Sequence, residues 1–173
     1  MPFVTNAYPI AIAAGKVQLS REINSSGVWM DGDGLHGVGR GKSELVPWAR
    51  LTGLRVIGPR ASGRWWGVLQ AALETLTPVS MRSRRSRIEW ETSRDGWQNL
   101  EVDPPGKARF ALKDLEALEA LFGAVEDSGR LEVLGDAGFI HEALQGLPAR
   151  TSWLGAITHR RVTPFAEELL VKY

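Results

Sequence analysis

Residues 114 to 127 constrain the fold more than any other stretch, because they predict an amphipathic helix. Asp114 is expected to cap its start, and Ser128 and Gly129 are expected to end it. Its apolar residues recur every three or four positions and therefore share one helix face; they are Leu115, Leu118, Leu121, Phe122 and Val125. A helix with one apolar face has to cover another layer of structure.

The segments before this helix predict that the other layer is an antiparallel sheet. They alternate apolar and polar residues over short distances, and turns separate them. Strands are expected within residues 16–23, 28–39, 44–58, 86–105 and 107–112. Hairpin turns are expected at residues 31–34 and 95–96, where aspartate and glycine stand side by side. Pro47 cannot donate a backbone hydrogen bond, so its strand is expected at a sheet edge or bent there.

The remaining segments predict mainly helices. A helix is expected near residues 63–76, and Pro78 would stop it. After residue 127 the pattern predicts a strand at 130–135, a helix at 136–147 and a last helix that starts at Thr163 and Pro164.

These elements together predict an α+β fold. An antiparallel sheet or a partly open barrel would pack with helices, and a helical C-terminal extension would follow. Residues 1–127 are expected to form the β-rich domain, with 63–76 as a helical insertion. Residues 128–173 are expected to pack on the same core as a helical extension.

The composition is that of an ordinary globular domain, and the absence of cysteine fits a reducing compartment. Of the 173 residues, 43% are hydrophobic and 24% are charged, and there is no cysteine. Disulfides, thiolate metal sites and thiol nucleophiles are therefore excluded. No apolar run is long enough for a membrane span, and the apolar patch near Pro9 lacks the basic region of a signal peptide. A cytoplasmic location is expected.

Charge is distributed unevenly along the chain. Residues 1–87 hold 12 Lys and Arg against 5 Asp and Glu, a net charge of +7, whereas residues 88–173 hold 9 against 15, a net charge of −6. This asymmetry has three interpretations: a basic face for polyanions, a head-to-tail contact between copies, or mutual neutralisation of the two halves within the fold.

Residues 36–43, which read His-Gly-Val-Gly-Arg-Gly-Lys-Ser, end like a phosphate-binding loop. That loop requires glycine where His36 stands and a helix after it, yet Pro47 falls in the first turns of such a helix. We therefore predict a glycine-rich turn and no nucleotide site. Asp31 and Asp33 are attributed to turn chemistry, because the further ligands of a calcium loop are missing. Neither a metal nor a cofactor is expected.

No other motif favours catalysis. The chain has no Gly-x-Ser-x-Gly nucleophile elbow, and Glu89 and Glu91 are interpreted as the solvated face of a hairpin. An enzyme assembled from dispersed residues remains open, but the balance favours a non-catalytic protein.

A cluster rich in arginine and tryptophan is the candidate polyanion-binding site. Guanidinium groups bind phosphates in a fork, and tryptophan faces stack on bases or lie at a lipid interface. The alternative is that the arginines protect a sheet edge and that the tryptophans belong to the core. The cluster consists of Arg64, Trp65, Trp66, Arg82, Arg84, Arg85 and Arg87.

The order of strands, hairpins and capped helix over residues 16–127 resembles the bacterial pleckstrin-homology-like domains. The resemblance is carried by a segment that links successive strands, matched here by Gly34, Leu35, Val46, Pro47, Trp48, Leu51, Gly53 and Leu54. The helix at 114–127 matches the one that plugs the barrel of that family. Residues 63–76 would be an insertion, and residues 128–173 have no counterpart. The resemblance implies a partly open antiparallel barrel that binds proteins, itself or anionic groups.

The function expected from the sequence is that of a non-catalytic interaction module. Its partner would be a protein, a second copy of the chain or an anionic headgroup. The alternative is a nucleic-acid-binding protein that uses the Arg/Trp-rich surface.

Overall fold

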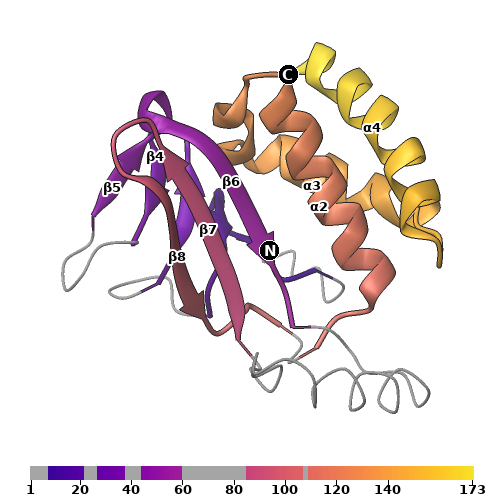
Figure 1. Cartoon of the computed structure of the whole chain (residues 1–173), viewed down its shortest axis with the longest axis horizontal. Helices are drawn as coiled ribbons and strands as arrows, with labels where there is room; N and C mark the ends of the chain where they lie inside the picture. The colour runs from indigo at the N-terminus through magenta and orange to yellow at the C-terminus, as the bar shows by residue number, and fades with distance from the viewer. Residues whose placement is uncertain (1–7, 22–26, 38–43, 60–84, 107–108) are drawn as a thin grey trace.

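The computed structural model describes residues 8–21, 27–37, 44–59, 85–106 and 109–173. Over these residues the chain forms two antiparallel sheets with helices packed on one side (Figure 1). The predicted α+β class is confirmed, and the two sheets do not close into a barrel. The predicted helix at 63–76 lies outside the described residues.

The first sheet is a meander of five short strands. They are β1 (Ala11–Ala13), β2 (Lys16–Gln18), β3 (Trp29–Asp31), β4 (Gly34–His36) and β5 (Leu45–Pro47), paired in chain order. The predicted turn after Asp31 joins β3 to β4, and the Asp33 backbone N–H donates to Asp31 Oδ1 over 3.0 Å. Gly34 has a φ of 152° and lies so close to β5 that a Cβ would be 2.3 Å from the Val46 carbonyl oxygen.

Pro47 ends β5 at the edge of this sheet, as predicted from its missing N–H. One turn of 3-10 helix, η1 (Trp48–Arg50), then leads into the second sheet, which consists of β6 (Leu51–Ile57), β7 (Ser86–Thr92) and β8 (Gly96–Val102). The predicted hairpin joins β7 to β8, where Thr92 faces Gly96. Gly96 supplies a φ of 66° at this turn.

The helical layer follows in the sequence. It consists of α2 (Leu112–Asp127), η2 (Leu131–Gly135), α3 (Ala137–Gly146), η3 (Leu147–Ala149) and α4 (Gly155–Lys172). The predicted helices at 114–127 and 136–147 are confirmed as α2 and α3. Asp114, however, lies in the first turn of α2, and Ala111 occupies the N-cap position.

Three local predictions are wrong. Residues 131–135 form the 3-10 helix η2 instead of a strand, because Leu131, Val133 and Leu134 are all buried and a strand would turn one of two neighbours outward. Of the strand expected at 107–112, the described part contains a single bridge residue, Phe110, before α2 begins. The last helix starts at Gly155, so Pro164 stands inside α4 on its exposed side.

One hydrophobic core joins the sheets to the α-helices that the structure describes. Met30 from the first sheet, Ile88 from the second, Leu121 from α2, Phe139 from α3 and Val162 from α4 belong to the same buried cluster. Among the described residues, no helix combines the length and the apolar character needed to span a membrane.

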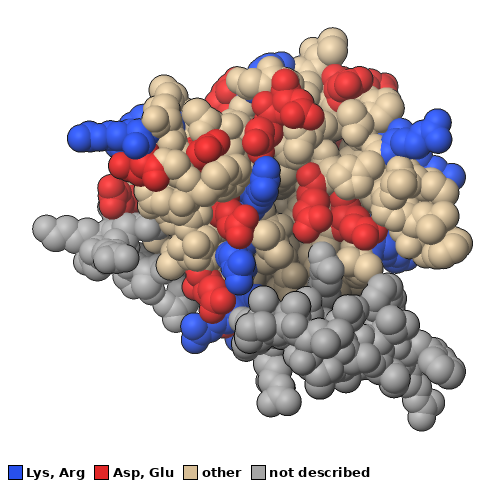
Figure 2. Space-filling model, in the orientation of Figure 1, with Lys and Arg blue, Asp and Glu red and all other residues tan. Residues whose placement is uncertain are grey.

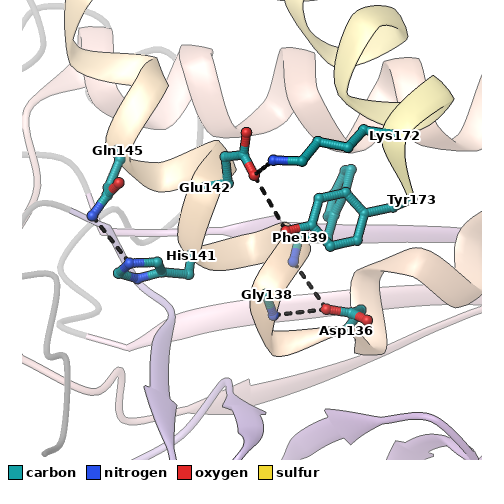
Figure 3. A network of polar contacts seen from close by, with 8 residues as sticks. All are labelled: Asp136, Gly138, Phe139, His141, Glu142, Gln145, Lys172 and Tyr173. Atoms are coloured by element: carbon teal, nitrogen blue, oxygen red, sulfur yellow. Dashed lines mark hydrogen bonds and ion pairs between the residues drawn. The ribbon is translucent and has the colours of Figure 1, made fainter.

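Polar contacts fasten the C-terminal end of α4 to α3 (Figure 3). Lys172 pairs with Glu142, and the Tyr173 hydroxyl donates to the same carboxylate over 3.2 Å. The Tyr173 ring also meets the Phe139 ring edge to face, with 5.6 Å between centroids. Asp136 caps α3 by accepting from the Phe139 backbone N–H over 2.9 Å. The end of the chain is thereby held against the first turn of α3.

Candidate functional site

The structure describes only two members of the predicted Arg/Trp cluster. Arg64, Trp65, Trp66, Arg82 and Arg84 lie outside the described residues. Arg85 and Arg87 lie at the start of β7, and each has a carboxylate beside it: Arg85 Nε is 3.9 Å from Asp103 Oδ1, and Arg87 Nη1 is 3.6 Å from Glu89 Oε1. These exposed pairs are worth little energetically. The cluster as a whole therefore stays a prediction.

The described part of the chain has a cleft between α2 and the second sheet. It has a volume of about 410 Å³, near the lower end of the range for small-ligand pockets. One wall is strand β6 with a side chain of β7, and the other is the C-terminal half of α2. Its lining residues are Arg55, Val56, Ile57, Glu89, Glu119, Phe122, Gly123, Glu126 and Asp127.

The cleft runs along the edge of β6. The side chains of consecutive strand residues point to opposite faces of a sheet. Arg55, Val56 and Ile57 are consecutive and all three line the cleft, so the cleft includes the edge of β6 between them. β6 is the first strand of its sheet and pairs with β7 on one side. Among the described residues, no backbone hydrogen bond reaches the other edge of β6 between Gly53 and Ile57. The cleft thus lies along the side of β6 that pairs with no described strand.

The α2 wall owes its shape to Gly123. A Cβ built on Gly123 would meet no atom within 4 Å, although the residue lies inside a 16-residue helix. Phe122, the preceding residue, is 2% exposed and forms the apolar floor. The missing side chain therefore leaves open space where a helix side chain would normally stand.

Trp97 of β8 packs on β6 beside the cleft residue Arg55. Its ring covers Gly53, where a Cβ would be 2.8 Å from ring atom Cη2, and the Arg55 guanidinium lies 4.4 Å from its centroid. Trp97 is 43% exposed. The stacked arginine is thus held over the outer face of the sheet, with one side of its guanidinium against the ring.

Among the described residues that line the cleft, carboxylates outnumber cations. Glu89, Glu119, Glu126 and Asp127 line it together with Arg55. Figure 2 shows acidic side chains gathered over the middle of this face, where β6, β7 and α2 lie in Figure 1, with basic ones between and around them. The charge of the cleft favours a cationic ligand.

A second polar cluster lies on the first sheet. His36 Nε2 is 2.7 Å from Asp31 Oδ1, and Lys16 Nζ is 3.9 Å from the other oxygen of that carboxylate. The His36 ring stacks on Trp29 at 4.9 Å between centroids, with 8° between the planes. His36 is therefore packed as a strand residue against Trp29 and Asp31. No group of metal-ligating side chains is found among the described residues.

Asp31 gives this cluster a predicted dependence on pH. Burial alone would raise the pKa of Asp31, but the hydrogen bonds and charges of His36, Asp33 and Lys16 together hold it below the ordinary 3.8. The stabilisation is therefore present above pH 3.8 and is lost as the pH falls through the lower pKa of the folded state. Urea unfolding of the protein and of Asp31→Asn should differ near neutral pH and converge in acid. A difference that persists unchanged in acid would contradict this prediction.

Sequence reasoning missed most of the cleft. The sequence places Glu89 on the solvated face of a hairpin, but no local sequence pattern indicates that this residue lies beside residues 119–127 of α2. Gly123 was the available signal, because a glycine inside a strongly apolar helix usually has a packing or functional reason.

No family model, no curated protein and no solved structure matches this chain.

Proposed function

We propose that the chain is a non-catalytic interaction module, and that the cleft between α2 and β6 binds a basic, extended segment of a partner protein. The observation that carries this proposal is the combination of a strand edge and an excess of carboxylates in one cleft.

The strand edge favours a peptide over a compact ligand. An extended peptide that adds to an exposed edge gains backbone hydrogen bonds at alternate residues, and its side chains point to opposite faces. Along β6 one of these faces is the apolar floor at Phe122, and the other carries Glu89 and Arg55. A segment that alternates apolar and basic residues fits both.

The charges favour a basic peptide over an acidic one. Glu119 and Glu126 stand on α2, and Glu126 reaches toward β6, where a Cβ on Gly53 would be 3.2 Å from its Oε1. A cationic side chain of the peptide would lie beside these carboxylates and Glu89 of β7. Attraction of this kind speeds association and selects against acidic segments.

Binding of a labelled Arg-Val-Arg-Val-Arg peptide, followed by fluorescence anisotropy, tests this proposal. Gly123→Leu is expected to weaken binding at least ~10-fold, because its side chain would occupy the open space of the cleft. Gly123→Ala is the matched control, since one methyl group fills little of that space, and it should bind within ~3-fold of the unaltered protein.

A charge variant separates attraction from shape. Glu126→Lys is expected to weaken binding of the same peptide, whereas Glu132→Lys, an exposed residue of η2 outside the cleft, should not. A peptide with Glu in place of Arg should not bind the unaltered protein. The proposal fails if the basic peptide does not bind at millimolar concentration, or if both lysine variants weaken binding equally.

Recognition of nucleic acid or of an anionic headgroup through the Arg/Trp cluster stays a prediction. So does the resemblance to pleckstrin-homology-like domains. Neither is needed for the proposal above, which rests on described residues alone.

A further inference from the structure

The outer face of α4 carries exposed side chains that no other part of the described chain covers. The opposite side of the helix packs on α2, with Val162, Ala166 and Leu169 buried. The outer stripe follows the spacing of one helix face; its members are Ala156, Arg160, Thr163, Glu167 and Val171. All of these are exposed except Thr163, which is half-buried.

Apolar side chains lie at both ends of this stripe. Trp153 is 84% exposed just before α4, and Val171 is 90% exposed in its last turn. Leu154, beside Trp153, is also exposed, whereas Tyr173 packs its ring on Phe139 of α3. Large apolar side chains left exposed often mark a contact surface.

The charges between these ends are unpaired within the described chain. Neither the Arg160 nor the Glu167 side chain forms an ion pair or a hydrogen bond with another described residue. Pro164 occupies the position one turn after Arg160, so the arginine has no i,i+4 carboxylate on its own helix. At the right of Figure 2, where α4 lies in Figure 1, basic side chains stand beside uncharged ones.

The stripe is complementary to a second copy of itself that runs in the opposite direction. Arg160 and Glu167 lie at equal distances from the middle of the stripe, between Thr163 and Pro164. Ala156 and Val171 are also equidistant from that middle, and Trp153 falls opposite the last turn of the helix. An antiparallel copy of the same helix would therefore place every arginine beside a glutamate and a small residue beside a valine.

We propose that α4 pairs with α4 of a second copy of this chain, antiparallel and about a two-fold axis near Thr163 and Pro164. Such an isologous contact closes after two copies. Arg160 of each copy lies beside Glu167 of the other, and Trp153 lies near Val171 of the other. The cleft at β6 lies on the other side of α2 from α4, so pairing leaves it open. The inference is independent of the proposed peptide binding.

Charge reversal tests this arrangement, with molar mass measured by light scattering after size exclusion over about 10 to 500 µM. A contact between two single helices is small, so a dissociation constant in the micromolar range is expected. Arg160→Glu or Glu167→Arg alone should raise that constant at least ~10-fold, because both symmetry-related pairs become repulsive.

Two further samples are specific to the antiparallel geometry. The double variant Arg160→Glu/Glu167→Arg restores both pairs with the charges exchanged, so it should dimerise within ~3-fold of the unaltered chain. An equimolar mixture of the two single variants should form a heterodimer, because every contact then joins opposite charges. A parallel pairing would place Arg160 beside Arg160 and predicts neither result.

The controls address folding and general charge effects. Arg94→Glu, in the exposed turn between β7 and β8, changes the net charge equally and should leave the dimer intact. Trp153→Ala should weaken the dimer without lowering the melting temperature of the monomer, since its side chain is 84% exposed. The proposal is overturned if the unaltered chain is monomeric at the highest concentration, or if the double variant dimerises no better than the single ones.

Discussion

Gly135→Ala is expected to destabilise the protein by about 3 kcal/mol. Gly135 ends η2 where this turn crosses β3, and a Cβ there would be 2.0 Å from the Asp31 carbonyl oxygen and 2.6 Å from its carbon. Both atoms belong to the backbone, so no side chain is able to move aside. The same carbonyl accepts a hydrogen bond from Trp48 Nε1 over 2.8 Å, and a shift of β3 would weaken that bond as well.

Urea unfolding followed by tryptophan fluorescence measures this effect. Gly123→Ala is the matched control, because a Cβ at Gly123 meets nothing within 4 Å and the residue lies inside a helix. That substitution should stabilise the protein by about 0.5–1 kcal/mol. The same change from glycine to alanine is thus expected to lower the unfolding free energy at Gly135 and to raise it at Gly123. Equal effects at the two positions would contradict the packing described for η2.

Phe139→Ala is expected to destabilise the protein by about 3–5 kcal/mol. Phe139 is fully buried in the first turn of α3, and its ring supports the ring of Tyr173. The substitution leaves a cavity under α3 and removes the apolar contact that holds the end of α4. The polar contacts of Lys172 and Tyr173 with Glu142 are exposed and cannot compensate for it.

Hydrogen exchange distinguishes this local role from a general loss of stability. In Phe139→Ala the amides of the last turn of α4 should exchange faster than the stability loss alone predicts, because that turn loses its support. Tyr173→Phe, which keeps the ring and removes the hydroxyl, should change the unfolding free energy by less than about 1 kcal/mol. Unchanged relative protection of the last turn in Phe139→Ala would show that Tyr173 does not depend on Phe139.

The elements that could be predicted are those whose signals are local. The β7–β8 hairpin follows from alternation of apolar residues and one Asp-Gly turn, and α2 follows from its apolar spacing. Pro47 was expected at an edge or a bend and stands at both, because its missing N–H acts on its own strand. None of these requires knowledge of what the element packs against.

The predictions that failed depended on packing. Residues 131–135 alternate apolar and polar residues like a strand. In the structure the neighbouring side chains of Val133 and Leu134 are both buried in the core, and this favours a 3-10 turn. Thr163 and Pro164 have the sequence of a helix start, yet the buried stripe of α4 extends back to Thr158, so the helix continues through the proline on its solvent side. The cleft was out of reach for the same reason, because β6 and α2 are separated by more than fifty residues.

The chain order of the five-stranded sheet has a kinetic consequence. Each strand pairs with its successor, so the sheet closes only short loops and can form early at little entropic cost. The crossing of η2 over β3 instead joins residues about a hundred positions apart. The meander is thus suited to act as a folding nucleus, and the helical layer, including both proposed contact surfaces, would be organised on it afterwards.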